Sequence, residues 1–367
     1  MSQQCRRRVP LLAFLAALVL AAFPAVGAEV PAQPRLIGSF IVPPDAGGED
    51  ATFGGISGLD YDAGRDVFYA ISDDRSEEGP ARFYTLRLVA DAEGLHDIEV
   101  VATTSLLGKD GKPFGKGRID PEALRFDAAS QHIFWTSESG DLGKPAIAES
   151  DLSGHLLRRL RPPRAVRWGN GGKEGVADNL GYEALAIVPE SGRILAVTEN
   201  ALKQDGPPAS ATAGSLSRIV LMEPDRPQSY TEYAYETDPA PSGALAFFAE
   251  NGVSEALALD AERFVFIERA FALGQARRIA FYVVTLKGAE EVTGLASLKG
   301  RDVTPVEKRL WFSLGAGAFG IEPDNIEAAS WGPKIGGERT LLVAADDNFG
   351  TFGQKNQFLL FAVPGMP

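Results

Sequence analysis

Thiols and imidazoles are scarce in this chain of 367 residues. Its one cysteine is Cys5, and its three histidines are His96, His132 and His155. Cys5 falls in an N-terminal segment that we expect to be removed, so the remaining chain has no disulfide, thiolate metal ligand or cysteine nucleophile. The histidines show no metal-ligand spacing, and each lies in or beside an expected outer strand. A histidine-based zinc site and a Ser-His-Asp triad are therefore disfavoured.

Acidic residues outnumber basic residues in this chain. The chain has 36 Lys and Arg against 49 Asp and Glu, which gives a net charge of −13 at pH 7. A nucleic acid would meet a repulsive field, so nucleic-acid binding is disfavoured. An acidic surface is instead suited to binding cations.

Long apolar runs are also rare, because only residues 11–23 form one. This run follows the basic cluster Arg6–Arg8 and precedes the small residues Val26–Ala28. The order predicts a secretory signal peptide over residues 1–28, since a membrane anchor needs about 20 apolar residues. We expect residues 29–367 to be a single domain, periplasmic or secreted, without a stable membrane anchor. Removal of three Arg and no acid leaves 33 basic and 49 acidic residues, a net charge of −16.

A short phrase recurs five times along the rest of the chain, at intervals of 61 to 72 residues. The five copies are Gly55–Leu59, Asp120–Leu124, Gly181–Leu185, Val253–Leu257 and Asn325–Ala329. Each copy opens an apolar strand, which is followed by a turn rich in Asp, Gly and Ser and then by further strands. Four antiparallel strands per unit of about 65 residues are typical of a β-propeller blade.

The repeats therefore predict an all-β fold, a β-propeller with four-stranded blades. We expect five blades, or six if residues 288–321 hold a degenerate one; within that stretch, residues 305–314 look helical. The strand expected at 35–42 has no unit of its own, so we expect it to complete the last blade and close the ring. An unclosed β-solenoid is the alternative.

Carboxylates recur where the first strand of each unit begins and where the second ends. These two points are neighbours in a β-hairpin, so the carboxylates of all blades should converge on one mouth of the propeller. The candidate metal ligands are Asp73, Asp74, Glu122, Glu183, Glu199, Glu255, Glu327, Asp346 and Asp347. So many like charges require protons or bound cations, and oxygen ligands favour Ca²⁺. The alternative is a structural role, in which each carboxylate caps a neighbouring strand.

Cationic side chains lie close to the same strand ends. Arg75, Arg118, Lys203 and Arg269 are the candidates for binding a phosphate or carboxylate of a substrate. The alternative is that they are ordinary surface charges or ion pairs.

Several motifs resemble the bacterial family called "esterase-like activity of phytase", the phytase-like domain. The matching segments are Phe53–Tyr61, Phe68–Arg75, Tyr182–Leu185, Asn325–Ala328 and Ala345–Phe349. The resemblance covers about residues 36–363 and implies phytase-like hydrolysis of phosphoesters, with the acidic residues as the active site. Ser57 stands where the other units have Glu, which puts the first blade's share of a metal site in doubt.

Three functions follow from these observations. The first is a Ca²⁺-dependent phosphoester hydrolase, with Glu183, Glu255 and Asp347 as the candidate catalytic carboxylates. The second is a lactonase or carboxylesterase that uses one metal ion in the same channel. The third is a propeller without chemistry that binds a ligand or a protein. For the enzymes we expect a small-molecule ester or phosphoester substrate and a monomeric protein.

Overall fold

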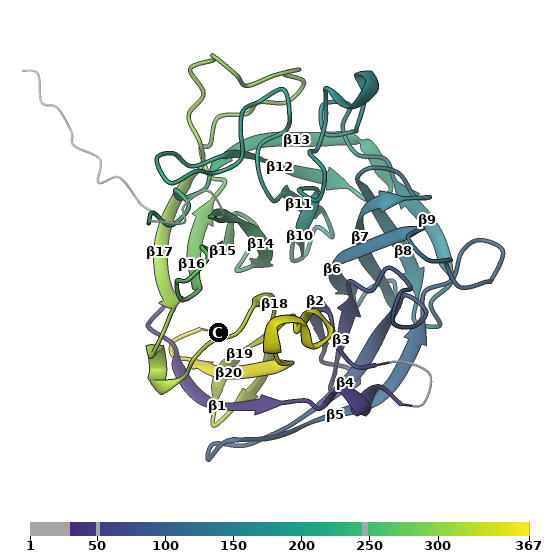
Figure 1. The fold of residues 1–367 in the computed structure, drawn as a ribbon, viewed down its shortest axis with the longest axis vertical. Helices are drawn as coiled ribbons and strands as arrows, with labels where there is room; N and C mark the ends of the chain where they lie inside the picture. The colour runs from purple at the N-terminus through teal and green to yellow at the C-terminus, as the bar shows by residue number, and fades with distance from the viewer. Residues whose placement is uncertain (1–29, 49–51, 244–248, 367) are drawn as a thin grey trace, which may run out of the picture.

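The computed structural model describes residues 30–48, 52–243 and 249–366, and it forms five four-stranded antiparallel sheets around a central axis (Figure 1). The predicted signal peptide, residues 1–28, lies outside the described residues. In the described part of the chain, no helix has the length and apolar character needed to cross a membrane.

Each of the first four blades is built from four strands that are consecutive in the chain. The first blade contains β2 (Ile56–Asp62), β3 (Val67–Ser72), β4 (Arg82–Ala90) and β5 (Leu95–Ser105). The second contains β6 (Ile119–Asp127), β7 (His132–Gly140), β8 (Ala146–Asp151) and β9 (Leu156–Leu160). The third contains β10 (Tyr182–Ile187), β11 (Ile194–Thr198), β12 (Leu216–Glu223) and β13 (Arg226–Glu236). The fourth contains β14 (Glu250–Ala258), β15 (Arg263–Phe271), β16 (Arg278–Thr285) and β17 (Glu307–Leu314).

The fifth blade combines the two ends of the described chain. It contains β18 (Ile326–Ile335), β19 (Glu338–Ala345) and β20 (Gln357–Val363), and its outer strand is β1 (Arg35–Ile41). β1 pairs antiparallel with β20 from Arg35 opposite Ala362 to Ile41 opposite Gln357. The prediction of five four-stranded blades is thus confirmed.

The expectation of a helix at 305–314 is wrong. Residues 307–314 form β17, the outer strand of the fourth blade, which pairs with β16. As an edge strand it leaves side chains such as Arg309 and Leu310 exposed, so its sequence lacks the strict alternation that marks an inner strand. The preceding residues 286–306 contain no strand; Val292 and Val306 instead donate backbone hydrogen bonds to Glu232 and Ala234 of β13.

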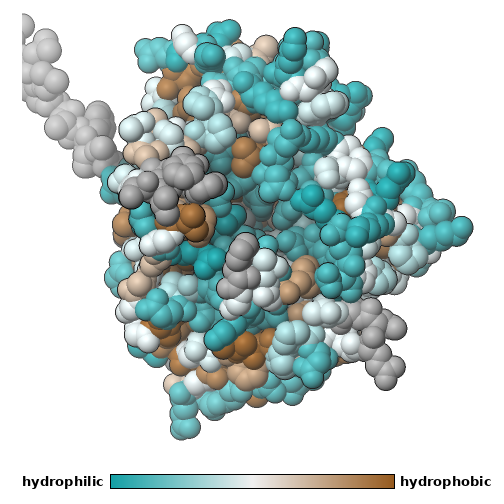
Figure 2. Space-filling view, viewed as in Figure 1, coloured by the Kyte–Doolittle hydropathy of each residue, from teal (hydrophilic) through white to brown (hydrophobic). Residues whose placement is uncertain are grey.

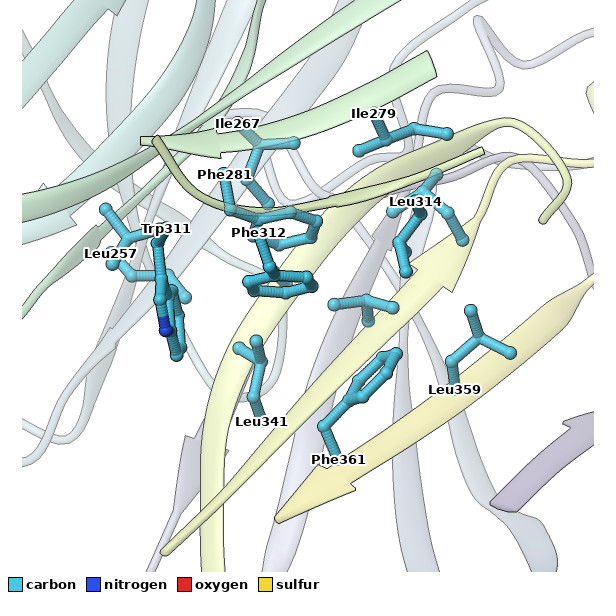
Figure 3. Packing of buried hydrophobic residues seen from close by; sticks show 14 of the residues in the cluster. Leu257, Ile267, Ile279, Phe281, Trp311, Phe312, Leu314, Leu341, Leu359 and Phe361 are labelled. Atoms are coloured by element: carbon cyan, nitrogen blue, oxygen red, sulfur yellow. The ribbon is translucent and has the colours of Figure 1, made fainter. Parts of the chain in front are cut away.

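The apolar core is divided among the contacts between blades. Five buried hydrophobic clusters each join two adjacent blades, including one that joins the fifth blade to the first. Between the fourth and fifth blades, Phe281 stacks on Phe312 with ring centroids 4.1 Å apart, and Phe361 packs beside them (Figure 3). Because blades bury their apolar faces against each other, the inner ends of the strands are free to carry polar side chains.

The innermost strands approach one another closely around the axis. A Cβ atom added to Gly58 of β2 would lie 2.3 Å from the backbone nitrogen of Leu124 in β6. Only glycine allows this distance between neighbouring blades. The close approach brings the polar ends of the inner strands within reach of each other.

Candidate functional site

The first hairpin of each blade carries an irregularity at the same place. In the first blade Ile56 pairs with Ser72 and Gly58 with Ile71, which leaves Ser57 between them without a partner. A bulge of this kind redirects a side chain at the end of a strand. The corresponding residues of the five blades are Ser57, Glu122, Glu183, Ser254 and Glu327.

A second set of side chains lies at or near the end of the strand that pairs with the bulge. In each blade it is the residue directly after the partner at the irregularity, as Asp73 follows Ser72. The set is Asp73, Glu138, Glu199, Arg269 and Asp346. Four blades therefore offer a carboxylate at this position, and the fourth blade offers a guanidinium.

Side chains from all five blades line one cavity of about 460 Å³. Its charged lining residues are Asp73, Arg75, Glu122, Glu183, Glu199, Glu250, Arg269, Arg277, Glu327 and Asp346. Figure 2 shows a hollow near the middle of the molecule with hydrophilic side chains around it. Seven carboxyl groups and three guanidinium groups meet here, so the predicted convergence of acidic residues is present in the structure.

Burial and mutual repulsion make four of the buried carboxyl groups, Glu122, Glu183, Glu199 and Asp346, hard to ionise. Burial raises the pKa of Glu122 well above its usual range, and the negative charge of the neighbouring Glu183 raises it further. Burial, followed by the charge of Glu138, does the same for the pKa of Glu183. Burial raises the pKa of Glu199 and that of Asp346 to about 8. At neutral pH the cavity therefore holds protons on several carboxyl groups unless a cation takes their place.

One group of carboxylates is close enough to share a cation. Asp120, Glu122 and Glu138 are all buried, and each offers an oxygen within 4.8 Å of the others. One oxygen of Glu138 accepts a hydrogen bond from the Gly181 backbone, while its Oε2 is buried without a hydrogen-bond partner. Within the described residues no other group of three meets this criterion. These three residues fit a hard cation such as Ca²⁺ or Mg²⁺, which prefers oxygen ligands.

Asp120 and Glu138 were not among the sequence-based candidates. Both stand at recognisable places, since Asp120 opens the second copy of the repeated phrase and Glu138 lies near the end of the second strand of that unit. The signal was the common separation of 16 residues, which links Glu122 to Glu138 as it links Glu183 to Glu199.

The fourth blade departs from the expected register by one residue. Its bulged residue is Ser254, and Glu255 pairs with Ile267 instead. Glu255 forms an ion pair of 2.6 Å with Arg125, and both side chains are almost completely buried. Burial raises the pKa of Glu255 to about 7, although Arg125 acts in the opposite direction. Glu255, predicted as a metal and catalytic residue, is therefore engaged by Arg125 and does not line the cavity.

Two further candidates are engaged in local structure. Asp74 pairs with Arg82 at 2.6 Å, where both side chains are buried, and it also accepts hydrogen bonds from the backbone of residues 77 and 78. Asp347 accepts hydrogen bonds from the Gly55 and Phe349 backbones and from Asn356. Neither lines the cavity.

The cationic candidates separate into two pairs. Arg75 and Arg269 line the cavity. Arg75 lies 2.6 Å from Asp120 and donates a hydrogen bond to Asn179, whereas Arg269 lies 3.2 Å from Glu327. Burial alone would lower the pKa of Arg269, but Glu327 and the other acidic neighbours raise it overall.

Arg118 and Lys203 lie outside the cavity lining. Arg118 pairs with the exposed Asp141 at 2.7 Å, and Lys203 lies 4.0 Å from Asp178. The sequence analysis missed Glu250 and Arg277, which do line the cavity. Neither belongs to the repeated hairpin positions, so the repeat gave no signal for them.

The chain matches one family model and is similar to several solved structures. Residues 51–349 match the family model described as "Phytase-like: Esterase-like activity of phytase". A sequence comparison with curated proteins finds no match. A bifunctional GH43-CE structure from Bacteroides eggerthii is 12% identical with a TM-score of 0.44, and the alignment covers 89% of this chain and 34% of that one. The periplasmic gluconolactonase PpgL of Pseudomonas aeruginosa is 12% identical with a TM-score of 0.37, over 86% of this chain and 88% of that one.

Proposed function

The chain belongs to the phytase-like family, and we propose that it is an exported, divalent-cation-dependent phosphoester hydrolase. The observation that carries this proposal is the cavity in which seven carboxyl groups face three guanidinium groups. Carboxylates hold hard cations, and guanidinium groups bind phosphate oxygens. A site for a phosphoester needs both kinds of group side by side.

Asp120, Glu122 and Glu138 are the residues that would hold the cation, and we propose Ca²⁺ as its identity. The bound ion would supply positive charge to phosphate oxygens and lower the pKa of a water molecule. Arg75 acts as a positioning residue, because its contact with Asp120 at 2.6 Å fixes that carboxylate. With the cation in place, the pKa values of the neighbouring carboxyl groups fall.

The remaining carboxyl groups provide proton transfer. Glu183 lies next to the proposed cation site, since Glu138 is the main charged neighbour that affects its pKa. Deprotonated in the presence of the cation, Glu183 would accept a proton from water as the general base. Glu199 lines the same cavity and would donate a proton to the leaving oxygen as the general acid.

The test combines cation binding with turnover in residues 29–367. After chelation, a cation at a hundred times its Kd should stabilise the folded state by about 2.7 kcal/mol and raise the melting temperature by several degrees. Glu183→Gln should remove phosphoester turnover while keeping the thermal shift, because Glu183 is not among the three proposed ligands. No shift with Ca²⁺, Mg²⁺ or Mn²⁺ would contradict the proposal.

A one-metal lactonase or carboxylesterase is the second candidate. It is favoured by one observation: the described residues bring together a single group of three carboxylates suited to one ion. A substrate panel separates the two, since a lactonase hydrolyses lactones and leaves phosphomonoesters intact. A protein that binds the cation but hydrolyses neither would be a ligand-binding propeller.

A further inference from the structure

A basic segment follows β9 on this otherwise acidic protein. Between Arg158 and Arg167 the chain carries five arginines, and Trp168 comes directly after them. Of these arginines, only Arg158 forms ion pairs with described residues, to Glu149 and, at 3.0 Å, to Asp225. We call Arg161, Arg164, Arg167 and Trp168 the arginine patch.

The patch is held on a single tight turn. The backbone nitrogens of Val166 and Arg167 both donate to the Pro163 carbonyl, at 3.2 and 3.3 Å. Arg164 and Arg167 therefore lie three residues apart on this turn. Pro163 and Val166 are buried beneath it, and Gln204 donates a hydrogen bond of 2.8 Å to the Ala165 carbonyl.

The arginines of the patch repel one another. Burial and then the charges of Arg161 and Arg164 lower the pKa of Arg167, and the Arg167 Nε is buried without a hydrogen-bond partner. Charged neighbours on the following loop do not relieve this: Glu174 accepts a hydrogen bond from Asn170, and Asp178 pairs with Lys144. The turn thus keeps like charges close in the chain, and none of these three arginines forms an ion pair with a described carboxylate.

Exposed apolar side chains accompany these charges. Trp168, directly after Arg167, is 48% exposed, and Leu157, in the strand β9 that precedes the patch in the sequence, is 42% exposed. Tryptophan beside basic residues is typical of the membrane–water interface, where the ring lies among headgroups and the cations meet phosphates. Arg161 and Arg164 are themselves exposed. They are therefore better placed to bind an extended surface than a small anion in a closed pocket.

We propose that the arginine patch is a docking surface for a membrane that carries anionic phospholipids. The guanidinium groups would bind lipid phosphates, and the Trp168 ring would enter the interfacial layer. This function is independent of the cavity and does not require the proposed hydrolysis.

The experiment measures binding of residues 29–367, which contain all twenty strands, to sedimented vesicles. One set of vesicles has equal parts phosphatidylglycerol and phosphatidylcholine, and the other is phosphatidylcholine alone. The test variant is Arg161→Gln/Arg164→Gln/Arg167→Gln. The control, Arg35→Gln/Arg87→Gln/Arg309→Gln, removes three exposed arginines that each pair with a glutamate. Thermal melting checks that all proteins are folded.

We expect the unchanged protein to bind the anionic vesicles and not the neutral ones. The test variant should lose about 100-fold in partitioning, since each basic residue near an anionic surface contributes roughly fivefold, and the control should stay within about threefold. Trp168 fluorescence should shift to shorter wavelength on binding. Equal loss in both variants, equal binding to neutral vesicles, or no vesicle binding together with capture of inorganic phosphate or an acidic peptide would overturn the proposal.

Discussion

The second and fourth blades build the same hairpin but give it opposite charge. The second presents Glu122 at the bulge and Glu138 at the following position, with Asp120 beside them. The fourth presents Ser254 and Arg269 at the same two positions. The repeated backbone therefore fixes where side chains meet, while single substitutions decide whether a blade offers a cation ligand or a counter-charge.

The largest effect should come from giving the fourth blade the charge of the others. Arg269→Glu removes the guanidinium next to Glu327 and adds a carboxylate, so without divalent cations the protein should lose about 3–5 kcal/mol of unfolding free energy. Denaturant titration after chelation measures this. Arg309→Glu, at an exposed pair with Glu307, should cost at most about 1 kcal/mol, and an equal loss in both variants would contradict the comparison.

The second blade can be tested by removing one of its negative charges. Glu138→Gln removes one proposed ligand and should reduce cation affinity roughly 100-fold, with phosphoester turnover falling in parallel. Calorimetric titration with Ca²⁺ measures the affinity. Glu250→Gln is the control, because Glu250 lines the cavity, as Glu122 does, but lies outside the group of three. Unchanged cation affinity in Glu138→Gln would show that other residues hold the cation.

The pH dependence of stability should reveal the repulsion among the remaining carboxyl groups. Glu199 and Asp346 have pKa values raised to about 8 in the folded protein, above those of the unfolded chain. The folded state then binds more protons, so cation-free protein should lose stability as pH rises from about 4.5 to 8, by roughly 1.4 kcal/mol per pH unit for each of the two groups. Saturating cation should flatten this slope. Stability that rises over the same range in chelator would contradict the assignment.

The smallest effect is expected at the bulges that carry serine. The Ser57 Oγ is buried without a hydrogen-bond partner, so Ser57→Ala should change the unfolding free energy by less than about 1 kcal/mol. Cation affinity should not change either. A tenfold loss of cation affinity would show that the first blade contributes a ligand. It would contradict the assignment of the cation ligands to a blade that carries glutamate at its bulge.

The fold was largely predictable because the repeated phrase and its hairpin recur in every blade. The position of the fourth bulge was not, because Glu255 is the third residue of its phrase, as the bulged Glu122 and Glu183 are, whereas the bulge falls on Ser254. The ion pair of Glu255 was not predictable either, because its partner Arg125 lies in another blade, 130 residues away. Register and long-range pairing thus account for most site residues that the sequence analysis misplaced.

The pairing of β1 with β20 also has a consequence for the order of folding. The fifth sheet joins Arg35 to Ala362, so one of its inter-strand ladders cannot form until nearly the whole described chain has been made. Contacts of such sequence separation are entropically costly and form slowly. The cavity takes Glu327 and Asp346 from that same sheet, so its full set of carboxylates should assemble only at the final step, when the two ends meet.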